Sequence, residues 1–212
     1  MVARAPVFTA PELALSDSAW AEMREDELGE LVDGVLAEEE VPDWVHESAV
    51  VWLIRVLAAW AAPRGGFVAG SELKYLLRPG LGRKPDVSVV LPGQRPPPRR
   101  GPVRRAPDIA VEVVSPSPRD AHRDRIEKLR EYAAFGVRWY WLLDPTMRTL
   151  EVYELGSDRR YAWATGAGAD TGSLEAVPGC EGLSLDLDAL WAELDRLGDE
   201  EPEETEAPEE SG

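Results

Sequence analysis

Two carboxylates on consecutive predicted strands are the residues best suited to chemistry in this chain. Asp86 lies near the start of the segment PDVSVVL (85–91), and Glu112 lies within PDIAVEVV (107–114). Side chains alternate along a strand, which places Glu112 among apolar neighbours on one face of the second segment. A glutamate there is costly unless a partner or a bound cation compensates it, and two carboxylates beside a backbone carbonyl suit Mg²⁺. An ion pair between Glu112 and a nearby arginine is the alternative.

A predicted helix over residues 119–135 adds a polar stripe. Asp124, Lys128 and Tyr132 are spaced four residues apart, so they share one helix face. The expected buried face consists of the apolar residues Ile126, Leu129 and Ala133. Such a stripe is usually a solvated surface with an Asp–Lys pair. The alternative is that the helix packs across the Glu112 strand, so that Lys128 points at the carboxylates and helps to activate a water molecule.

The elements that must position these residues follow from periodicity and from turn residues. Asp43 is a plausible N-cap for the helix over 44–62, and Gly136 a plausible C-cap for the helix over 119–135. The expected buried side of the first helix is Val45, Ala49, Trp52, Val56 and Ala59. The predicted strands are 67–77, 85–91, 107–114, 137–144 and a hairpin of 149–155 with 159–165. A short helix and an extended segment around Gly34 precede this core, and a last helix over 183–197 follows it.

The central order is therefore α-β-β-β-α-β, which predicts an α/β fold with a mixed sheet flanked by helices. The 212 residues suggest one domain over 1–198, and the single cysteine, Cys180, excludes a disulfide framework. The longest apolar run has 14 residues and contains Arg55, which is too short and too polar to span a membrane. Without a visible secretory signal, a cytoplasmic location is expected.

Charge is distributed unevenly along the chain. The net charge is −17, yet residues 78–130 carry +7, whereas the tail over 199–212 carries −8. The tail has no residue that could build a core, so we expect it to be disordered. It could screen the basic middle from nonspecific DNA. The basic middle removes the objection to a nucleic-acid partner that the overall charge raises.

Several motifs together resemble a known family. They are ELVDG (30–34), His46 at a helix start, KPDVSVV (84–90), PDIAVEVVSPS (107–117), DRIEKLREYAAFGVRWYWLLDP (124–145) and LEVYEL (150–155). The chain resembles the PD-(D/E)XK restriction-endonuclease-like superfamily and, more closely, its Uma-two family. The resemblance covers roughly residues 7–191.

The resemblance implies roles for individual residues. It implies Asp86, Glu112 and Lys128 as catalytic residues, and Asp86, Glu112 and the Val113 carbonyl as ligands of Mg²⁺, for which Mn²⁺ can substitute. The lysine of the superfamily motif would fall at position 114, which is valine here; Lys128 from the following helix replaces it. The accessory candidates are Glu30, Glu72, His46, Asp124 and Tyr132. Glu72 is expected on the strand before Asp86, His46 as a structural residue, and Tyr132 as a support for Lys128.

The implied function is an Mg²⁺-dependent endonuclease that hydrolyses DNA phosphodiesters. The expected nucleic-acid contacts are Arg83, Lys84, Arg99, Arg100, Arg104, Arg105, Arg119 and Arg123. The proline- and arginine-rich loop over 92–105 is expected to clamp the backbone, or alternatively to offset nearby acids or bind a protein. A homodimer is plausible for double-strand cutting. The alternatives are a catalytically silent binding module, or a nuclease that acts on RNA or on branched or single-stranded DNA.

Overall fold

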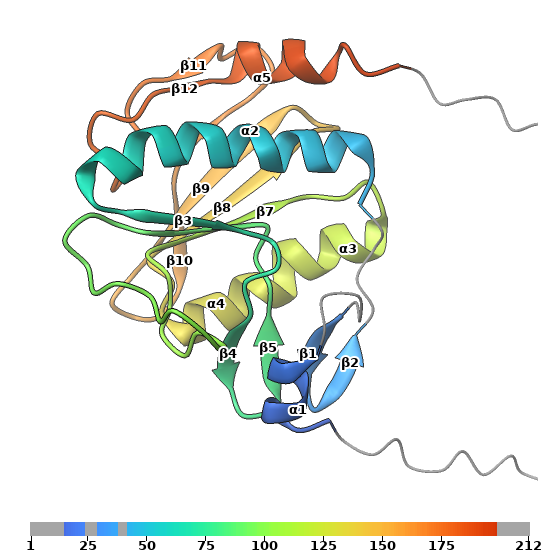
Figure 1. Cartoon of the computed structure of the whole chain (residues 1–212). Helices are drawn as coiled ribbons and strands as arrows, with labels where there is room; N and C mark the ends of the chain where they lie inside the picture. The colour runs from blue at the N-terminus through green and yellow to red at the C-terminus, as the bar shows by residue number, and fades with distance from the viewer. Residues whose placement is uncertain (1–14, 24–28, 38–41, 199–212) are drawn as a thin grey trace, which may run out of the picture.

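The computed structural model describes residues 15–23, 29–37 and 42–198, and its helices lie on both sides of a central sheet (Figure 1). The helices are α1 (Asp17–Glu22), α2 (Trp44–Ala61), η1 (Ala62–Arg64), α3 (Pro118–His122), η2 (Arg123–Lys128), α4 (Leu129–Phe135) and α5 (Leu187–Leu194). The first six strands are β1 (Glu30–Val32), β2 (Val35–Ala37), β3 (Phe67–Gly70), β4 (Tyr75–Arg78), β5 (Leu81–Arg83) and β6 (Val87–Val90). The others are β7 (Ile109–Val113), β8 (Trp139–Asp144), β9 (Thr149–Leu155), β10 (Tyr161–Ala167), β11 (Ser173–Leu174) and β12 (Leu185–Asp186). The predicted disordered tail lies outside the described residues.

The central sheet has six strands in the order β10-β9-β8-β7-β6-β3. Only β7 and β8 pair in parallel, with Glu112 opposite Leu142, and the other pairings are antiparallel. The crossover between β7 and β8 is the helical segment α3–η2–α4. The predicted α/β fold with a mixed sheet flanked by helices is confirmed.

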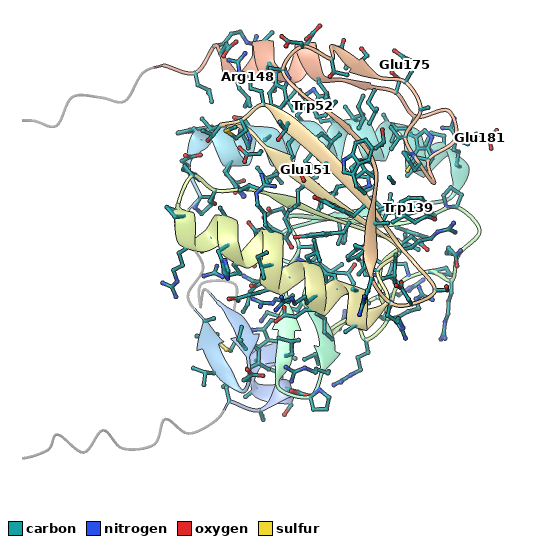
Figure 2. The ribbon with its side chains drawn as sticks, turned by 180° about the vertical axis from the view of Figure 1, so that it is seen from behind. Trp52, Trp139, Arg148, Glu151, Glu175 and Glu181 are labelled. Atoms are coloured by element: carbon teal, nitrogen blue, oxygen red, sulfur yellow. The ribbon has the colours of Figure 1, made fainter. Side chains whose placement is uncertain are left out.

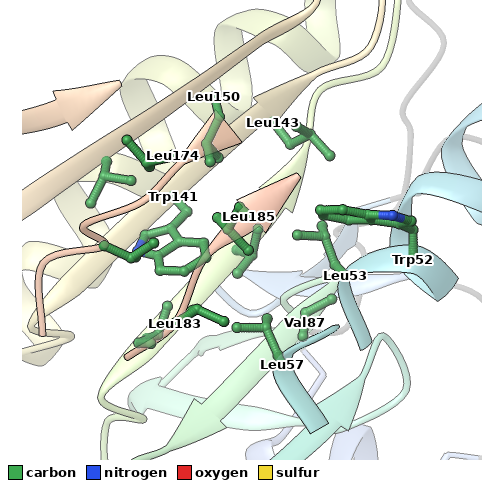
Figure 3. Close-up of a cluster of buried hydrophobic side chains, with 14 of the residues drawn as sticks. Trp52, Leu53, Leu57, Val87, Trp141, Leu143, Leu150, Leu174, Leu183 and Leu185 are labelled. Atoms are coloured by element: carbon green, nitrogen blue, oxygen red, sulfur yellow. The ribbon is translucent and has the colours of Figure 1, made fainter. Parts of the chain in front are cut away.

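Strand alternation separates two cores, as predicted for β7. Ile109, Val111 and Val113 face the larger cluster, whereas Ala110 and Val114 face the smaller one. The larger cluster joins the sheet to α2 and α5, and Figure 3 shows Leu53 and Leu57 of α2 near Val87 of β6, with Trp141 of β8 beside Leu185. Cys180 is buried in this cluster, consistent with a packed residue.

Helix α2 begins where predicted, because the Asp43 side chain accepts a hydrogen bond from the His46 backbone N–H (2.7 Å). Its predicted buried face is only partly correct. Val45 and Ala59 are exposed, whereas Leu53 and Leu57 are buried. The helix is apolar on almost every side, so periodicity alone does not identify the face that packs on the sheet.

Among the described residues, one segment, Trp44–Arg64, is long and apolar enough to cross a membrane by length and composition. Core helices of globular proteins meet the same criterion. Here the apolar side of α2 packs on the central sheet and on α5, and its Arg55 forms an ion pair with Glu193 (2.6 Å).

The single strand predicted over residues 67–77 is wrong. The chain turns after β3, and β4 pairs with β5 in a second sheet of order β2-β1-β5-β4. The glycine-containing segment that follows β4 forms β5. Gly82 permits this, because a Cβ there would lie 2.3 Å from the Trp20 ring. Trp20, Leu31 and Leu76 form the core of this sheet.

The predicted helix over 119–135 forms as three consecutive helical pieces, and its middle piece, η2, is a π-helix. Gly136 ends it with a positive φ of 100°, as predicted. The predicted buried face is partly wrong: Ala133 is buried and Leu129 is partly buried, but Ile126 is 39% exposed. Figure 2 shows this helix crossing the sheet near Glu151 of β9, which accepts a hydrogen bond from Arg125.

Candidate active site

A cavity of about 160 Å³ lies where β6 begins and β7 ends. It is bordered by residues at the start of α2, by residues of α3 and η2, and by Glu30 of β1. Its lining side chains include seven carboxylates (Glu30, Glu47, Glu72, Asp86, Glu112, Asp120 and Asp124), three cations (Lys84, Arg123 and Lys128) and His46. Asp86, Glu112, Val113 and Lys128, which are far apart in sequence, therefore meet at one cavity.

Asp86 is held by hydrogen-bond donors from two elements. Its Oδ2 accepts a hydrogen bond from the Val113 backbone N–H (2.7 Å) and lies 3.3 Å from His46 Nε2. His46 reaches Asp86 because Asp43 fixes the first turn of α2. Both contacts fall on one oxygen, which orients the carboxylate and leaves Oδ1 outside the hydrogen bonds found among the described residues.

Glu112 is almost completely buried, at 1% exposure. Lys128 Nζ donates a hydrogen bond to its Oε2 (2.8 Å), and the Tyr132 hydroxyl donates one to its Oε1 (2.7 Å). The alternative, an ion pair with an arginine, is therefore wrong: the cation is Lys128. Tyr132 supports Glu112 directly rather than Lys128.

The polar stripe on the crossover helix faces the sheet. Asp124, Lys128 and Tyr132 are all buried, and Lys128 Nζ lies 3.1 Å from Asp124 Oδ1. The interpretation as a solvated surface is thus wrong, since the partners on β7 compensate these polar groups. Tyr140 of β8 donates a hydrogen bond from its hydroxyl to the Asp124 carbonyl (2.9 Å), within the π-helical turn. Wide helical turns of this kind are frequent at functional sites.

The electrostatics of the cavity favour additional positive charge. Burial, opposed by Lys128 and reinforced by Asp86, holds the pKa of Glu112 well above its usual range. Burial likewise raises the pKa of Asp124. Burial alone would lower the pKa values of Lys128 and His46, but Glu112 and Asp86, respectively, outweigh it and raise both. All four groups retain protons more strongly than in water.

A divalent cation suits this donor set in charge and in ligand chemistry. Asp86 and Glu112 offer hard carboxylate oxygens, and Val113, whose backbone carbonyl is the third candidate ligand, also lines the cavity. In the described part of the chain, no group of three or more His, Cys, Asp or Glu side chains is arranged to hold a metal ion. Mg²⁺ does not require such a group, because proteins commonly hold it with one or two carboxylates plus water and substrate phosphate.

The two candidate accessory glutamates, Glu30 and Glu72, differ in their burial and in their partners. Glu30 is buried (2% exposed) and accepts hydrogen bonds from Arg83 Nη1 (2.6 Å) and the Lys84 backbone N–H (2.9 Å). Glu72 lies in the turn between β3 and β4 rather than on the predicted strand, and its side chain is 56% exposed. Its carboxylate is 3.7 Å from Lys84 Nζ.

The expected nucleic-acid residues are dispersed. Arg83 is completely buried between Glu30 and Glu131, so its guanidinium cannot reach a phosphate and this prediction is wrong. Lys84 and Arg123 line the cavity, and Arg119 is exposed on α3. The remaining candidates lie on the loop over 92–105, which does not line the cavity.

Sequence reasoning missed two acidic residues of the cavity, Glu47 and Asp120. Asp120 had a readable signal, because Ser117 caps α3 and its hydroxyl lies 2.8 Å from Asp120 Oδ2. Ser and an acidic residue spaced by three mark a helix start. Glu47 had no comparable signal in the acidic segment around it.

This fold is that of a solved nuclease-like protein. The crystal structure of "a putative nuclease belonging to DUF820" from Anabaena variabilis superposes with a TM-score of 0.65 and 19% sequence identity. The match covers 85% of this chain and 99% of the other. At this identity the likeness establishes the fold.

The family follows from the sequence comparison. Residues 17–188 match the Uma2 family, described as "Putative restriction endonuclease". The chain therefore belongs to this restriction-endonuclease-like nuclease family, as the sequence motifs predicted. No curated protein shows significant similarity to it.

Proposed function

We propose that the protein is a divalent-metal-dependent endonuclease that hydrolyses DNA phosphodiester bonds. One observation carries the proposal: Asp86, Glu112 and Lys128, from a strand start, a strand and a crossover helix, converge on one cavity in a restriction-endonuclease-like fold. The surplus of carboxylates supports a bound cation rather than a bare anion as the first ligand.

The proposed ligands of Mg²⁺ or Mn²⁺ are Asp86, Glu112 and the Val113 carbonyl. A bound divalent cation would stabilise charge developing on the phosphate and lower the pKa of a water molecule. The chain's own groups do the rest. Tyr132 and Lys128 fix the two oxygens of Glu112, while His46 and the Val113 N–H fix Asp86. Lys128, held by Glu112 and Asp124, orients the attacking water through its ammonium group.

Plasmid nicking in Mg²⁺ or Mn²⁺ tests the proposal. Asp86→Asn keeps the shape of the side chain and removes its charge, so cleavage should fall by at least ~100-fold. Glu175→Gln removes an exposed carboxylate on another part of the surface (labelled in Figure 2) and should leave cleavage unchanged. Calorimetric titration with Mn²⁺ measures cation binding separately from cleavage. Cation binding without cleavage by the wild type would favour a catalytically silent module, and equal cleavage by both variants would refute the site.

A further inference from the structure

The loop over residues 92–105, between β6 and β7, concentrates positive charge on an exposed surface. It contains no acidic residue, and its five arginines are all exposed: Arg95, Arg99, Arg100, Arg104 and Arg105. The guanidinium is planar and pairs two donors with phosphate oxygens, so it is suited to a nucleic-acid backbone.

The loop is anchored to the body of the protein. Val103 is buried (4% exposed), its N–H donates to the Lys74 carbonyl (2.8 Å), and its carbonyl accepts from the Leu76 N–H (2.9 Å). Arg105 donates a hydrogen bond to the Arg95 carbonyl across the loop. Three consecutive prolines over 96–98 restrict the backbone further. The arginines are thus presented on a partly ordered scaffold, which lowers the entropic cost of binding.

The topology places this loop away from the candidate active site. Asp86 precedes β6 and Glu112 lies near the end of β7, whereas the loop joins the opposite ends of these antiparallel strands. The five residues of extended chain from Asp86 to Leu91 span about 16 Å. In Figure 1 the loop lies at the end of the sheet where α2 ends, and the starts of α2 and α3 lie at the other end.

The cavity itself is a poor binding site for a polyanion, because its seven carboxylates outnumber its three cations. A nucleic acid that reaches the cavity must therefore draw binding energy from elsewhere on the protein. We propose that the loop over 92–105 is a second, remote binding surface for the nucleic-acid backbone, so that a productive substrate spans both ends of the sheet. This inference rests on the proposed function and assigns it a substrate requirement, namely length.

A minimum length follows from the geometry. A separation of about 16 Å corresponds to roughly five base pairs at 3.4 Å each. Because a duplex must also extend past each contact, substrates shorter than about 10 base pairs should reach only one of the two surfaces.

Fluorescence anisotropy with labelled duplexes of 6 and 30 base pairs tests this proposal in the absence of divalent metal. Arg99→Gln/Arg100→Gln should weaken binding of the long duplex several-fold and reduce the slope of log K against log salt by about two. Without metal the short duplex can bind only at the loop, because the carboxylates of the cavity repel it, so the variant should weaken its binding as well. The matched control, Arg130→Gln/Arg196→Gln, removes two exposed arginines outside the loop and the cavity and should behave as the wild type.

Equal affinities and salt slopes of the wild type and the loop variant on the long duplex would overturn the proposal. So would an equal loss in the control, or cleavage of the short duplex in Mg²⁺ that is as efficient as cleavage of the long one. If the loop variant instead lost affinity only for phosphatidylserine vesicles, the loop would be a membrane-binding surface, which also overturns the proposal. Because this binding assay needs neither metal nor cleavage, its failure is distinguishable from a failure of plasmid nicking, which would count against the proposed function.

Discussion

The two faces of the central sheet are covered by helices of opposite character. On one face, α2 and α5 bury almost exclusively apolar side chains, including Trp52, Leu57 and Leu190. On the other, the crossover helix buries Asp124, Lys128 and Tyr132 against Glu112. The comparison separates two tasks: the first face supplies the area that stabilises the fold, and the second carries charges that a stable core alone would not need.

Burying the charged side chains of the polar face is energetically unfavourable, which suggests that they are kept for function. Burying charges is costly even when they are paired, and well-packed apolar residues often stabilise as much or more. The Glu112–Lys128 pair lines the cavity of the candidate active site. The unfavourable burial of these charges therefore occurs where they could take part in chemistry. If the two faces are separate in this way, a substitution on one face should leave the property supplied by the other unchanged.

Lys128→Met should have the largest effect, on the polar face. Removing the ammonium takes away the group that orients the attacking water, so cleavage should fall by about 100-fold or more. It also leaves the buried carboxylates Glu112 and Asp124 without their cation, which should cost about 3 kcal/mol of stability. Plasmid nicking and denaturant unfolding measure the two effects. Unchanged cleavage in the folded variant would exclude Lys128 from catalysis.

Leu57→Ala makes the opposite test on the apolar face. Leu57 is fully buried between α2 and the sheet, so the free energy of unfolding should fall by about 2–5 kcal/mol. Mn²⁺ affinity, measured by calorimetry well below the unfolding temperature, should remain that of the wild type. A parallel loss of metal affinity would show that the two faces are coupled.

His46 connects α2 to the cavity, because its Nε2 lies 3.3 Å from Asp86. If it positions that carboxylate, His46→Ala should weaken Mn²⁺ binding by about 10-fold. His46→Gln, whose amide can donate a similar hydrogen bond, should recover most of the loss. Equal affinities of both variants and the wild type would make His46 a packing residue.

Glu30 gives a smaller, pH-dependent effect. Burial alone would raise its pKa, but Lys128, Arg83 and the Lys84 N–H outweigh burial and lower it below 4.5. Its stabilising contribution is therefore fully present above pH 4.5 and is lost as the pH falls through the lower, folded-state pKa. Glu30→Gln should flatten this acid-side decline of the free energy of unfolding, measured by denaturant unfolding as the pH is lowered from 5 to 3. An unchanged pH profile would assign the decline to other carboxylates.

Removal of the acidic tail should have the smallest effect. If residues 199–212, with a net charge of −8, screen the basic surface, removing them should raise duplex affinity a few-fold and steepen its salt dependence. Anisotropy at low salt provides the measurement. Identical affinity with and without the tail would refute screening.

Local signals predicted much of the fold and of the site. Alternation along β7 identified which face Glu112 occupies, and the capping residues Asp43 and Gly136 located the start of α2 and the end of α4. The buried role of Arg83 and the insertion of β4 and β5 could not be predicted in this way. Both depend on partners distant in sequence, Glu30 and Trp20, which local patterns do not contain.

The parallel pairing of β7 and β8 has a consequence for folding. Glu112 lies just before the crossover and Lys128 within it, only 16 residues apart, so their meeting closes a short loop at small entropic cost. The hairpin of β9 and β10 adds to the outer side of β8 and contributes no residue to the cavity. Folding can therefore begin with β6, β7 and the crossover helix. The residues of the site then come together before β9 and β10 join the sheet.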